Sequence, residues 1–176
     1  MKNIGKERGT IYLYTGEGGG KTTNALGLAL RCVGHGRKVV IVQFLKWWKN
    51  TGEYKIRERL APEYQIRQFG RRGWKGLGNL NERDRELTRK GLEFAKRAVK
   101  EKPHLLVLDE INLALDCKLI TVNEVIDFLK TVPKETNVVL TGRRAPKELI
   151  EFADFVNEVI DVKHPEEIPT VRGIQY

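Results

Sequence analysis

The sequence predicts an α/β fold in which one mainly parallel sheet carries helices on both faces. The first observation is that short apolar, β-branched runs alternate along the chain with segments of helical spacing. The second is that no series of hairpin turns joins the runs, which favours parallel pairing. The third is the length of 176 residues, which suits one domain with a sizeable core. We therefore expect a single domain over residues 1–176, with residues 1–9 as a flexible N-terminal segment.

Strands and helices are expected to alternate from the first apolar run to the last. Most apolar runs are short enough to be strands buried on both faces of the sheet. The expected strands are residues 10–14, 38–45, 64–69, 104–108, 137–140 and 158–162. The expected helices are residues 22–33, 53–60, 82–99, 122–129 and 147–152.

The positions of glycine and proline support this division into strands and helices. Gly34-His35-Gly36 follows the first helix, where a left-handed cap is expected, and Pro103 separates the third helix from the fourth strand. The third helix has one charged face and one apolar stripe, so it should pack against the rest of the domain. The stripe consists of Leu87, Gly91, Phe94, Ala95, Ala98 and Val99.

Composition excludes disordered and membrane-spanning proteins. Hydrophobic residues make up 40% and charged residues 31% of the chain, which leaves no apolar run of the roughly 20 residues that a span needs. The first five residues are followed by charge, so we see no secretory signal and expect a cytoplasmic protein. Cys32 and Cys117 do not form a C-x-x-C pair and are expected to be reduced, buried thiols.

The net charge of +9 is concentrated in residues 67–102, which hold twelve basic and five acidic residues. Such a stretch could follow a nucleic-acid backbone. Acidic residues such as Glu86 and Glu93 are interleaved with the basic ones, however, as on a solvated helix with many ion pairs. We favour the solvated helix and keep nucleic-acid binding as an alternative.

The strongest local signal is the segment TGEGGGKTT at residues 15–23, between an apolar strand and a helix. Glycines let several backbone N–H groups point inward, and the helix adds its positive end, so the loop suits a polyphosphate. Lys21 supplies a cation, and the Thr22 hydroxyl can ligate Mg²⁺. The usual G-x-x-x-x-G-K-[ST] spacing is not met, because the first glycine is Gly16 rather than residue 15. Phosphate binding does not depend on that difference.

Two further strands end in polar residues that should reach the same edge of the sheet. Asp109 and Glu110 follow the apolar run at 105–108, and ligands gather at the carboxyl ends of parallel strands. Asp109 is expected to hold Mg²⁺ directly or through water, although a lone acidic residue there would be read as a helix cap. Arg143 follows the strand at 137–140 and can bind a phosphate with two hydrogen bonds.

Read together, these residues resemble the P-loop-type ATP:corrinoid adenosyltransferases, the family that adenosylates vitamin B12 precursors. The loop that is one residue short is typical of that family. The resemblance implies a single-domain, P-loop NTPase-like (RecA-like) fold and covers about residues 8–176. It rests on TGEGGGKTT at 15–23, RCVGHGRKVVIVQFLK at 31–46, LLVLDEIN at 105–112, VVLTGR at 138–143 and VKH…RGIQY at 162–176.

The resemblance also implies a reaction. Co(I) of a reduced corrinoid attacks the 5′ carbon of ATP, the deoxyadenosyl group moves to cobalt, and triphosphate leaves, as in cob(I)yrinic acid a,c-diamide adenosyltransferases. Such a reaction serves adenosylcobalamin synthesis or salvage. The implied cofactors and partners are Mg²⁺ or Mn²⁺ with ATP, a reductase or flavoprotein that donates electrons, and a second copy of the chain in a homodimer. Neither a membrane nor a nucleic acid is expected as a partner.

The family pattern assigns roles to individual residues. Lys21, Thr22 and Glu110 are the expected catalytic residues, and Thr22, Asp109 and Glu110 are the expected metal ligands. The expected substrate-binding residues are Gly16, Glu17, Gly18, Gly19, Gly20, Lys21, Thr22, Thr23, Gln43, Arg143 and Trp74.

The chain departs from the family pattern at two places. Gly19 stands where the family often has a lysine, which removes one positive charge from the loop. In the segment expected to contact the corrinoid, only Trp74 is aromatic. Trp47 and Trp48 either cover a ligand or pack a loop against the domain, and His164 in the terminal motif is a further candidate.

Three alternatives stay open at this point. A P-loop kinase or ATPase would use the same loop to cleave the β–γ bond of ATP and would release ADP. A nucleic-acid-binding ATPase would use the basic stretch at 67–102 and would bind less tightly as salt rises. A corrinoid carrier that no longer transfers the adenosyl group is suggested by Gly19.

Overall fold

The structure, a computed structural model, describes residues 8–73, 76–167 and 170–174. Six parallel strands form one sheet in the order β3-β2-β4-β5-β1-β6. The strands are β1 (Ile11–Thr15), β2 (Val39–Phe44), β3 (Tyr64–Phe69), β4 (Leu105–Asp109), β5 (Asn137–Thr141) and β6 (Phe155–Glu158). The predicted α/β class, with a P-loop NTPase-like sheet covered by helices, is therefore confirmed.

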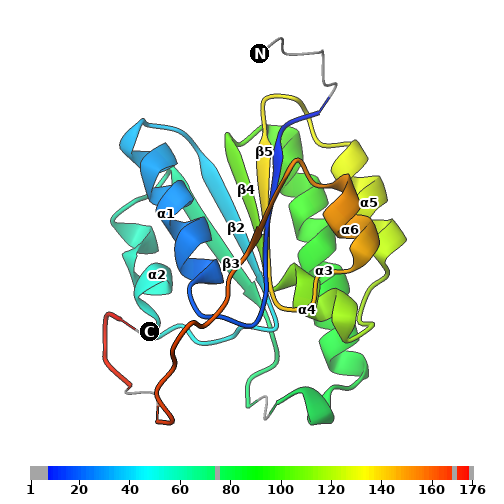
Figure 1. Ribbon diagram of the computed structural model, residues 1–176. Helices are drawn as coiled ribbons and strands as arrows, with labels where there is room; N and C mark the ends of the chain where they lie inside the picture. The colour runs from blue at the N-terminus through cyan, green and yellow to red at the C-terminus, as the bar shows by residue number, and fades with distance from the viewer. Residues whose placement is uncertain (1–7, 74–75, 168–169, 175–176) are drawn as a thin grey trace.

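Helices cover both faces of the sheet (Figure 1). On the first face lie α1 (Lys21–Gly34) and α2 (Gly52–Lys55), the latter followed by the 3₁₀ turn η1 (Ile56–Glu58). On the second face lie α3 (Glu82–Ala98), α4 (Ile111–Asp116), α5 (Val122–Lys130) and α6 (Lys147–Phe152). Two more 3₁₀ turns, η2 (Leu77–Asn79) and η3 (Val99–Glu101), flank α3.

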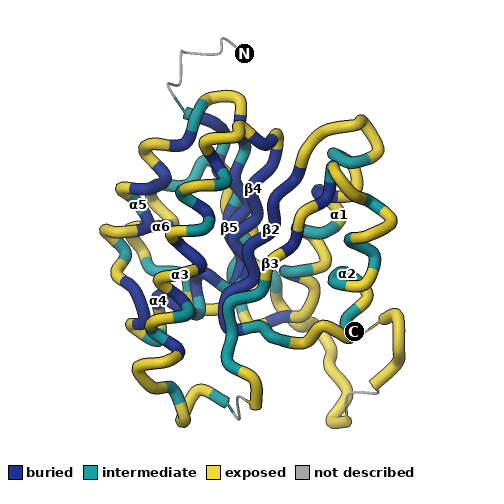
Figure 2. Tube along the Cα trace, turned by 180° about the vertical axis from the view of Figure 1, so that it is seen from behind, coloured by how far each residue is buried: buried dark blue, intermediate teal, exposed yellow. Residues whose placement is uncertain are grey.

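The core lies between the sheet and these two helical layers (Figure 2). All six residues of β2 are buried, as the β-branched run VVIVQF predicts for a strand covered on both faces. Helix α3 lies so close to the sheet that a Cβ at Gly91 would come within 2.8 Å of the Phe44 ring. Each large aliphatic side chain buried in this way contributes roughly 1.5–3 kcal/mol.

The charged face of α3 is solvated, as expected. Ion pairs join Arg83 and Lys90 to Glu86 and Lys96 to Glu93 along the exposed side of the helix. A capping box begins the helix. The Asn81 side chain accepts a hydrogen bond from the Arg83 N–H, and the Asp84 carboxylate accepts one from the Asn81 N–H.

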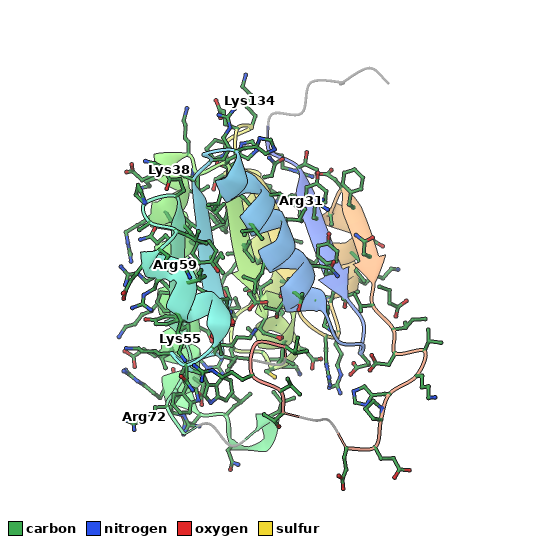
Figure 3. The ribbon with its side chains drawn as sticks, turned by 90° about the vertical axis from the view of Figure 1, so that its left-hand side faces the viewer. Arg31, Lys38, Lys55, Arg59, Arg72 and Lys134 are labelled. Atoms are coloured by element: carbon green, nitrogen blue, oxygen red, sulfur yellow. The ribbon has the colours of Figure 1, made fainter. Side chains whose placement is uncertain are left out.

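Basic side chains also lie well away from α3. The labelled ones in Figure 3 spread from Lys38 and Lys134 at one end of the molecule to Arg72 at the other. Basic side chains are therefore not confined to the stretch at 67–102.

Two expectations about secondary structure need correction. The last strand was expected at 158–162, but β6 is Phe155–Glu158, because Phe155 pairs with Tyr12 of β1 and stacks on its ring. The short helix α4 at Ile111–Asp116 is absent from the expected helices, because no element was assigned to these residues.

The expectations for the N-terminal segment and for the two cysteines can be compared only with the described part of the chain. Residues 1–7 lie outside it, and Arg8 is fixed to Asp154 by an ion pair of 2.8 Å. Cys32 and Cys117 are partly buried, unpaired thiols, and burial raises the pKa of each. None of the described helices is long and apolar enough to cross a bilayer.

Candidate active site

The glycine-rich loop connects the carboxyl end of β1 to the first turn of α1. Gly16 and Gly20 have φ values of 93° and 101°, which favour glycine. The loop packs against the segment after β6, because a Cβ at Gly16 would lie 2.4 Å from the Val159 carbonyl oxygen. The Gly18 N–H donates to that same oxygen at 2.8 Å, and the Gly19 N–H donates to the Asp161 carboxylate at 3.1 Å. The chain that follows β6 therefore shapes the loop.

Lys21 lies beneath the loop that it was expected to serve. Its ammonium group donates to the Gly16 carbonyl oxygen at 2.7 Å and to the Gly18 carbonyl oxygen. Burial, followed by repulsion from Arg143, lowers the pKa of Lys21. The cation is thus held by the backbone that would surround a bound phosphate.

Asp109, at the carboxyl end of β4, is the centre of a buried hydrogen-bond network. Its Oδ1 accepts from the hydroxyls of Thr22 at 2.8 Å and Thr141 at 2.7 Å. Its Oδ2 accepts from the Gln43 amide at 3.0 Å and from the Lys46 ammonium at 2.7 Å. Burial alone would raise the pKa of Asp109, but Lys46 and the hydroxyl donors hold it below its usual range. The carboxylate therefore joins three strands and α1 at one point.

Lys46 is a site residue to which the sequence interpretation gave no role. Its Nζ atom lies 2.7 Å from Asp109 Oδ2 and 3.0 Å from Thr22 Oγ1. Leu45, with φ of 59°, turns the chain at the end of β2 and brings Lys46 over this pair. Burial alone would lower the pKa of Lys46, but attraction to Asp109 raises it. The sequence feature that could have identified Lys46 is its position two residues after the end of a strand, at the edge of the sheet where ligands bind.

Gln43 lies behind the site. Its side chain is fully buried, donates to Asp109, and accepts from the Gln68 amide at 3.0 Å. The expected direct contact of Gln43 with a substrate does not fit this burial. The residue instead orients Asp109.

Glu110 faces the site with a free carboxylate. Its backbone is left-handed, with φ of 64°, and its N–H donates to the Thr141 hydroxyl at 3.0 Å. Among the described residues no hydrogen bond or ion pair to the Glu110 carboxylate is found, and the residue lines a cavity. Burial, together with the nearby charge of Asp109, raises the pKa of Glu110. A strained backbone that presents a poorly solvated carboxylate is typical of functional sites.

Arg143 meets the glycine loop across the mouth of the site. Its Nη1 lies 3.2 Å from Glu17 Oε2, and Arg144 Nε lies 3.7 Å from Glu17 Oε1. These groups are more than half exposed, so the ion pairs are weak and exchangeable. Glu17 therefore pairs with Arg143, the arginine expected to bind phosphate, and with its neighbour Arg144.

Two cavities meet at Lys46 and Trp48, which line both. The larger cavity, about 840 Å³, extends along α1 and α2 to Gly173 and Ile174 near the end of the chain. The smaller cavity, about 350 Å³, is lined by Leu45, Lys46, Trp48, Leu77, Glu110, Leu113, Arg143 and Arg144. Together they bring residues from both ends of the sequence to the phosphate loop.

The two tryptophans have different surroundings. The Trp47 and Trp48 rings lie 5.4 Å apart, and the indole nitrogen of Trp47 is buried. Trp48 is 41% exposed and lines both cavities, so it is the one placed to contact a ligand. Trp74 lies outside the described residues. His164 is exposed beside the carbonyl oxygen of its neighbour Pro165 and lines neither cavity.

The oxygen groups at the site fit a magnesium ion that arrives with a nucleotide. In the described part of the chain, no three His, Cys, Asp or Glu residues cluster as a self-sufficient metal site. Thr22, Asp109 and Glu110 offer a hydroxyl and carboxylates, and Mg²⁺ prefers few protein oxygens combined with phosphates. The free carboxylate of Glu110 fits this ion best.

The sequence matches one family model over almost its whole length. That model, for ATP:corrinoid adenosyltransferase BtuR/CobO/CobP, matches residues 7–176. A corrinoid adenosyltransferase of Sinorhizobium sp is 38% identical over 175 residues, which cover 97% of this chain and 81% of the relative. A corrinoid adenosyltransferase of Escherichia coli K12 is 36% identical over 159 residues, which cover 90% of this chain and 80% of the relative. Corrinoid adenosyltransferase CobA of Salmonella typhimurium LT2 is 33% identical over 174 residues, which cover 97% of this chain and 87% of the relative.

Proposed function

We propose how this site works from one premise: the chain belongs to the ATP:corrinoid adenosyltransferase family. It transfers the 5′-deoxyadenosyl group of ATP to Co(I) of a reduced corrinoid and releases triphosphate. The electron pair of Co(I) forms the bond to the 5′ carbon, and the pair of the broken carbon–oxygen bond leaves on triphosphate. The nucleophile is therefore the substrate itself, and the protein needs no catalytic triad.

The observation that carries the proposal is that Lys21, Arg143 and the glycine-rich loop lie together at one edge of the sheet. The negative charge on the departing triphosphate grows as the carbon–oxygen bond breaks. Fixed cations and N–H donors aimed at this charge stabilise the transition state more than the ground state. We assign the triphosphate to loop residues 16–23, with Lys21 beneath it and Arg143 above it.

We further propose that Thr22, Asp109 and Glu110 hold a magnesium or manganese ion. A divalent ion at this place supplies positive charge to the triphosphate. Thr22 is fixed for this role by its hydrogen bond to Asp109, which is fixed in turn by Gln43 and Thr141.

Adenosine and corrinoid would meet at Trp48, since that side chain lines both cavities. Leu45, Leu77 and Leu113 give the smaller cavity an apolar wall, which suits a ring system. Near Leu77, Arg71 forms an ion pair of 3.1 Å with the buried Asp84 and donates to the Asn79 carbonyl oxygen at 2.8 Å. Trp74 remains the proposed contributor to shielding cobalt from a lower axial ligand.

The proposal extends to partners and location. An electron-donating reductase or flavoprotein would generate Co(I), and the protein would work in the cytoplasm. Exposed apolar side chains on the edge strand β6, Phe155 and Val156, support a homodimer.

The reaction can be tested directly in solution. Protein, ATP, Mg²⁺ and chemically reduced cobalamin are mixed without oxygen, and the absorption spectrum is followed. We expect a cobalt–carbon product that light destroys. Absence of that product under fully reducing conditions would contradict the proposed function.

A further inference from the structure

The Lys46 ammonium occupies the place that a metal ion bound to Thr22 and Asp109 would take. It contacts Thr22 Oγ1 at 3.0 Å and Asp109 Oδ2 at 2.7 Å. Magnesium binds oxygen at about 2.1 Å, and in the proposed metal position it would use these same two oxygens. An ion and the ammonium group cannot share the position.

Asp109 has no acceptor capacity left while Lys46 is present. A carboxylate offers about four lone-pair sites. Thr22, Thr141, Gln43 and Lys46 each donate one hydrogen bond to Asp109, two to each oxygen. Three of these donors are fixed on strands or on α1, whereas Lys46 follows the end of β2.

Lys46 is also the donor that can leave most easily. Its side chain is 21% exposed and lines both cavities, whereas the Asp109 side chain is 1% exposed. A lysine carries its charge on a flexible four-carbon stem, so the ammonium can move several ångströms without a backbone change. The cavities give it a path towards the place where a triphosphate would lie.

We propose that Lys46 is a resident cation that closes the metal site while ATP is absent and yields that site to the ion that arrives with ATP. The displaced ammonium then faces the triphosphate, where it adds a positive charge that Gly19 does not provide. This inference rests on the metal position of the proposed function. Asp109 keeps a cationic partner in both states, so the buried carboxylate is never left uncompensated.

The expected consequence is that nucleotide and metal bind together. In the nucleotide-free protein, a free divalent ion must first expel Lys46, so only the fraction of molecules with Lys46 displaced can bind it. Removing the lysine removes this penalty, and the apparent affinity for the free ion should rise about tenfold or more.

The test is an electron paramagnetic resonance titration with Mn²⁺ alone, repeated with Mn²⁺ and ATP. Lys46→Met removes the charge with little change of volume, and Lys49→Met is the matched control because Lys49 is an exposed neighbouring lysine. The wild-type chain and Lys49→Met should bind Mn²⁺ weakly without ATP, and Lys46→Met should bind it at least about tenfold more tightly. Equal affinities in all three would overturn the proposal.

Two further measurements keep the test decisive. If Lys46→Met unfolds without metal, Mn²⁺ should raise its melting temperature, and the double variant Lys46→Met/Asp109→Asn should not respond. A Lys46→Met melting temperature that does not depend on Mn²⁺ would contradict the proposal. If the wild-type chain does not bind Mn²⁺ even with ATP, the metal position in the proposed function is refuted. If the wild-type chain binds Mn²⁺ with ATP but Lys46→Met has no higher affinity for free Mn²⁺, this inference alone is refuted.

Discussion

The two walls of the active site are built in different ways. On the phosphate side, Asp109 joins Thr22, Thr141 and Gln43 through hydrogen bonds, and these residues lie on strands or on the first turn of α1. On the opposite side, Leu77 begins the 3₁₀ turn η2, Trp48 lies in the loop after β2, and both contribute apolar surface. The difference indicates that charge stabilisation needs fixed polar groups, whereas a ring system needs an adaptable apolar wall. Changes on the phosphate side should affect catalysis and stability, and changes on the apolar side should affect affinity for the corrinoid.

The largest effect on catalysis is expected for Lys21→Ala. Loss of this cation should reduce adenosyl transfer about 1,000-fold, because the departing triphosphate loses a fixed positive charge. The rate is measured anaerobically from the growth of the cobalt–carbon absorption. Lys38→Ala, at the far end of the sheet, is the control and should retain the wild-type rate. A Lys21→Ala rate close to that of the control would remove the loop from the mechanism.

A slightly smaller effect, on stability, is expected for Asp109→Asn. The change leaves the Lys46 ammonium without its anion, so the free energy of unfolding should fall by about 3 kcal/mol. Denaturant unfolding in the presence of a chelator measures this, with Asp116→Asn as the control because Asp116 only makes an ion pair at the surface with Arg144. A loss no greater than in Asp116→Asn would show that the network does not stabilise the fold.

The difference in the free energy of unfolding between wild type and Asp109→Asn should depend on pH. The pKa of Asp109 is lowered in the folded protein. The contribution of its carboxylate to the free energy of unfolding is therefore complete above the ordinary aspartate pKa of about 3.9 and is lost as pH falls through the lowered pKa. The pKa of Lys46 is raised, so its contribution is complete below about 10.4 and is lost as pH rises through the raised value. The stability difference between wild type and Asp109→Asn should therefore be flat near neutral pH and shrink at both extremes.

On the apolar wall, Trp48→Ala should raise the KM for the corrinoid about tenfold and change the Kd for ATP much less. The indole lines both cavities, but most of the affinity for ATP should come from the phosphate contacts. Leu30→Ala is the control, since Leu30 is an exposed apolar residue on the outer part of α1. An equal change in both constants would mean that the two walls are not functionally separate.

The smallest effects are expected in the loop itself. Glu17→Gln frees Arg143 from its ion pair, and Gly19→Lys restores the lysine of the family pattern, so each should tighten ATP binding about threefold. A Cβ at Gly19 meets no atom within 4 Å, so the backbone there leaves room for a side chain to begin. Calorimetry at low and high salt measures both, and the gain should shrink as salt rises. A gain that does not depend on salt would argue against an electrostatic cause.

The polar wall was largely predictable from the sequence. Lys21, Thr22, Asp109 and Arg143 follow the carboxyl ends of parallel strands or begin the helix after one, and a parallel sheet gathers these ends at one edge. The structure brings them together as expected.

What could not be predicted depends on how loops turn and which strands pair. The role of Lys46 depends on the left-handed conformation of Leu45, and the burial of Gln43 depends on Gln68 of the neighbouring strand. The position of β6 was misjudged because pairing with β1, rather than local apolar content, decides where that strand lies. The contact between Asp161 and the loop follows from that pairing.

The central claim is that this site stabilises an intact triphosphate as the leaving group. A single-turnover reaction with ATP and excess reduced cobalamin, followed by phosphorus nuclear magnetic resonance, tests it most directly. We predict one triphosphate for each cobalt–carbon bond formed, with no ADP at early times. Formation of ADP and phosphate in step with turnover would contradict the claim.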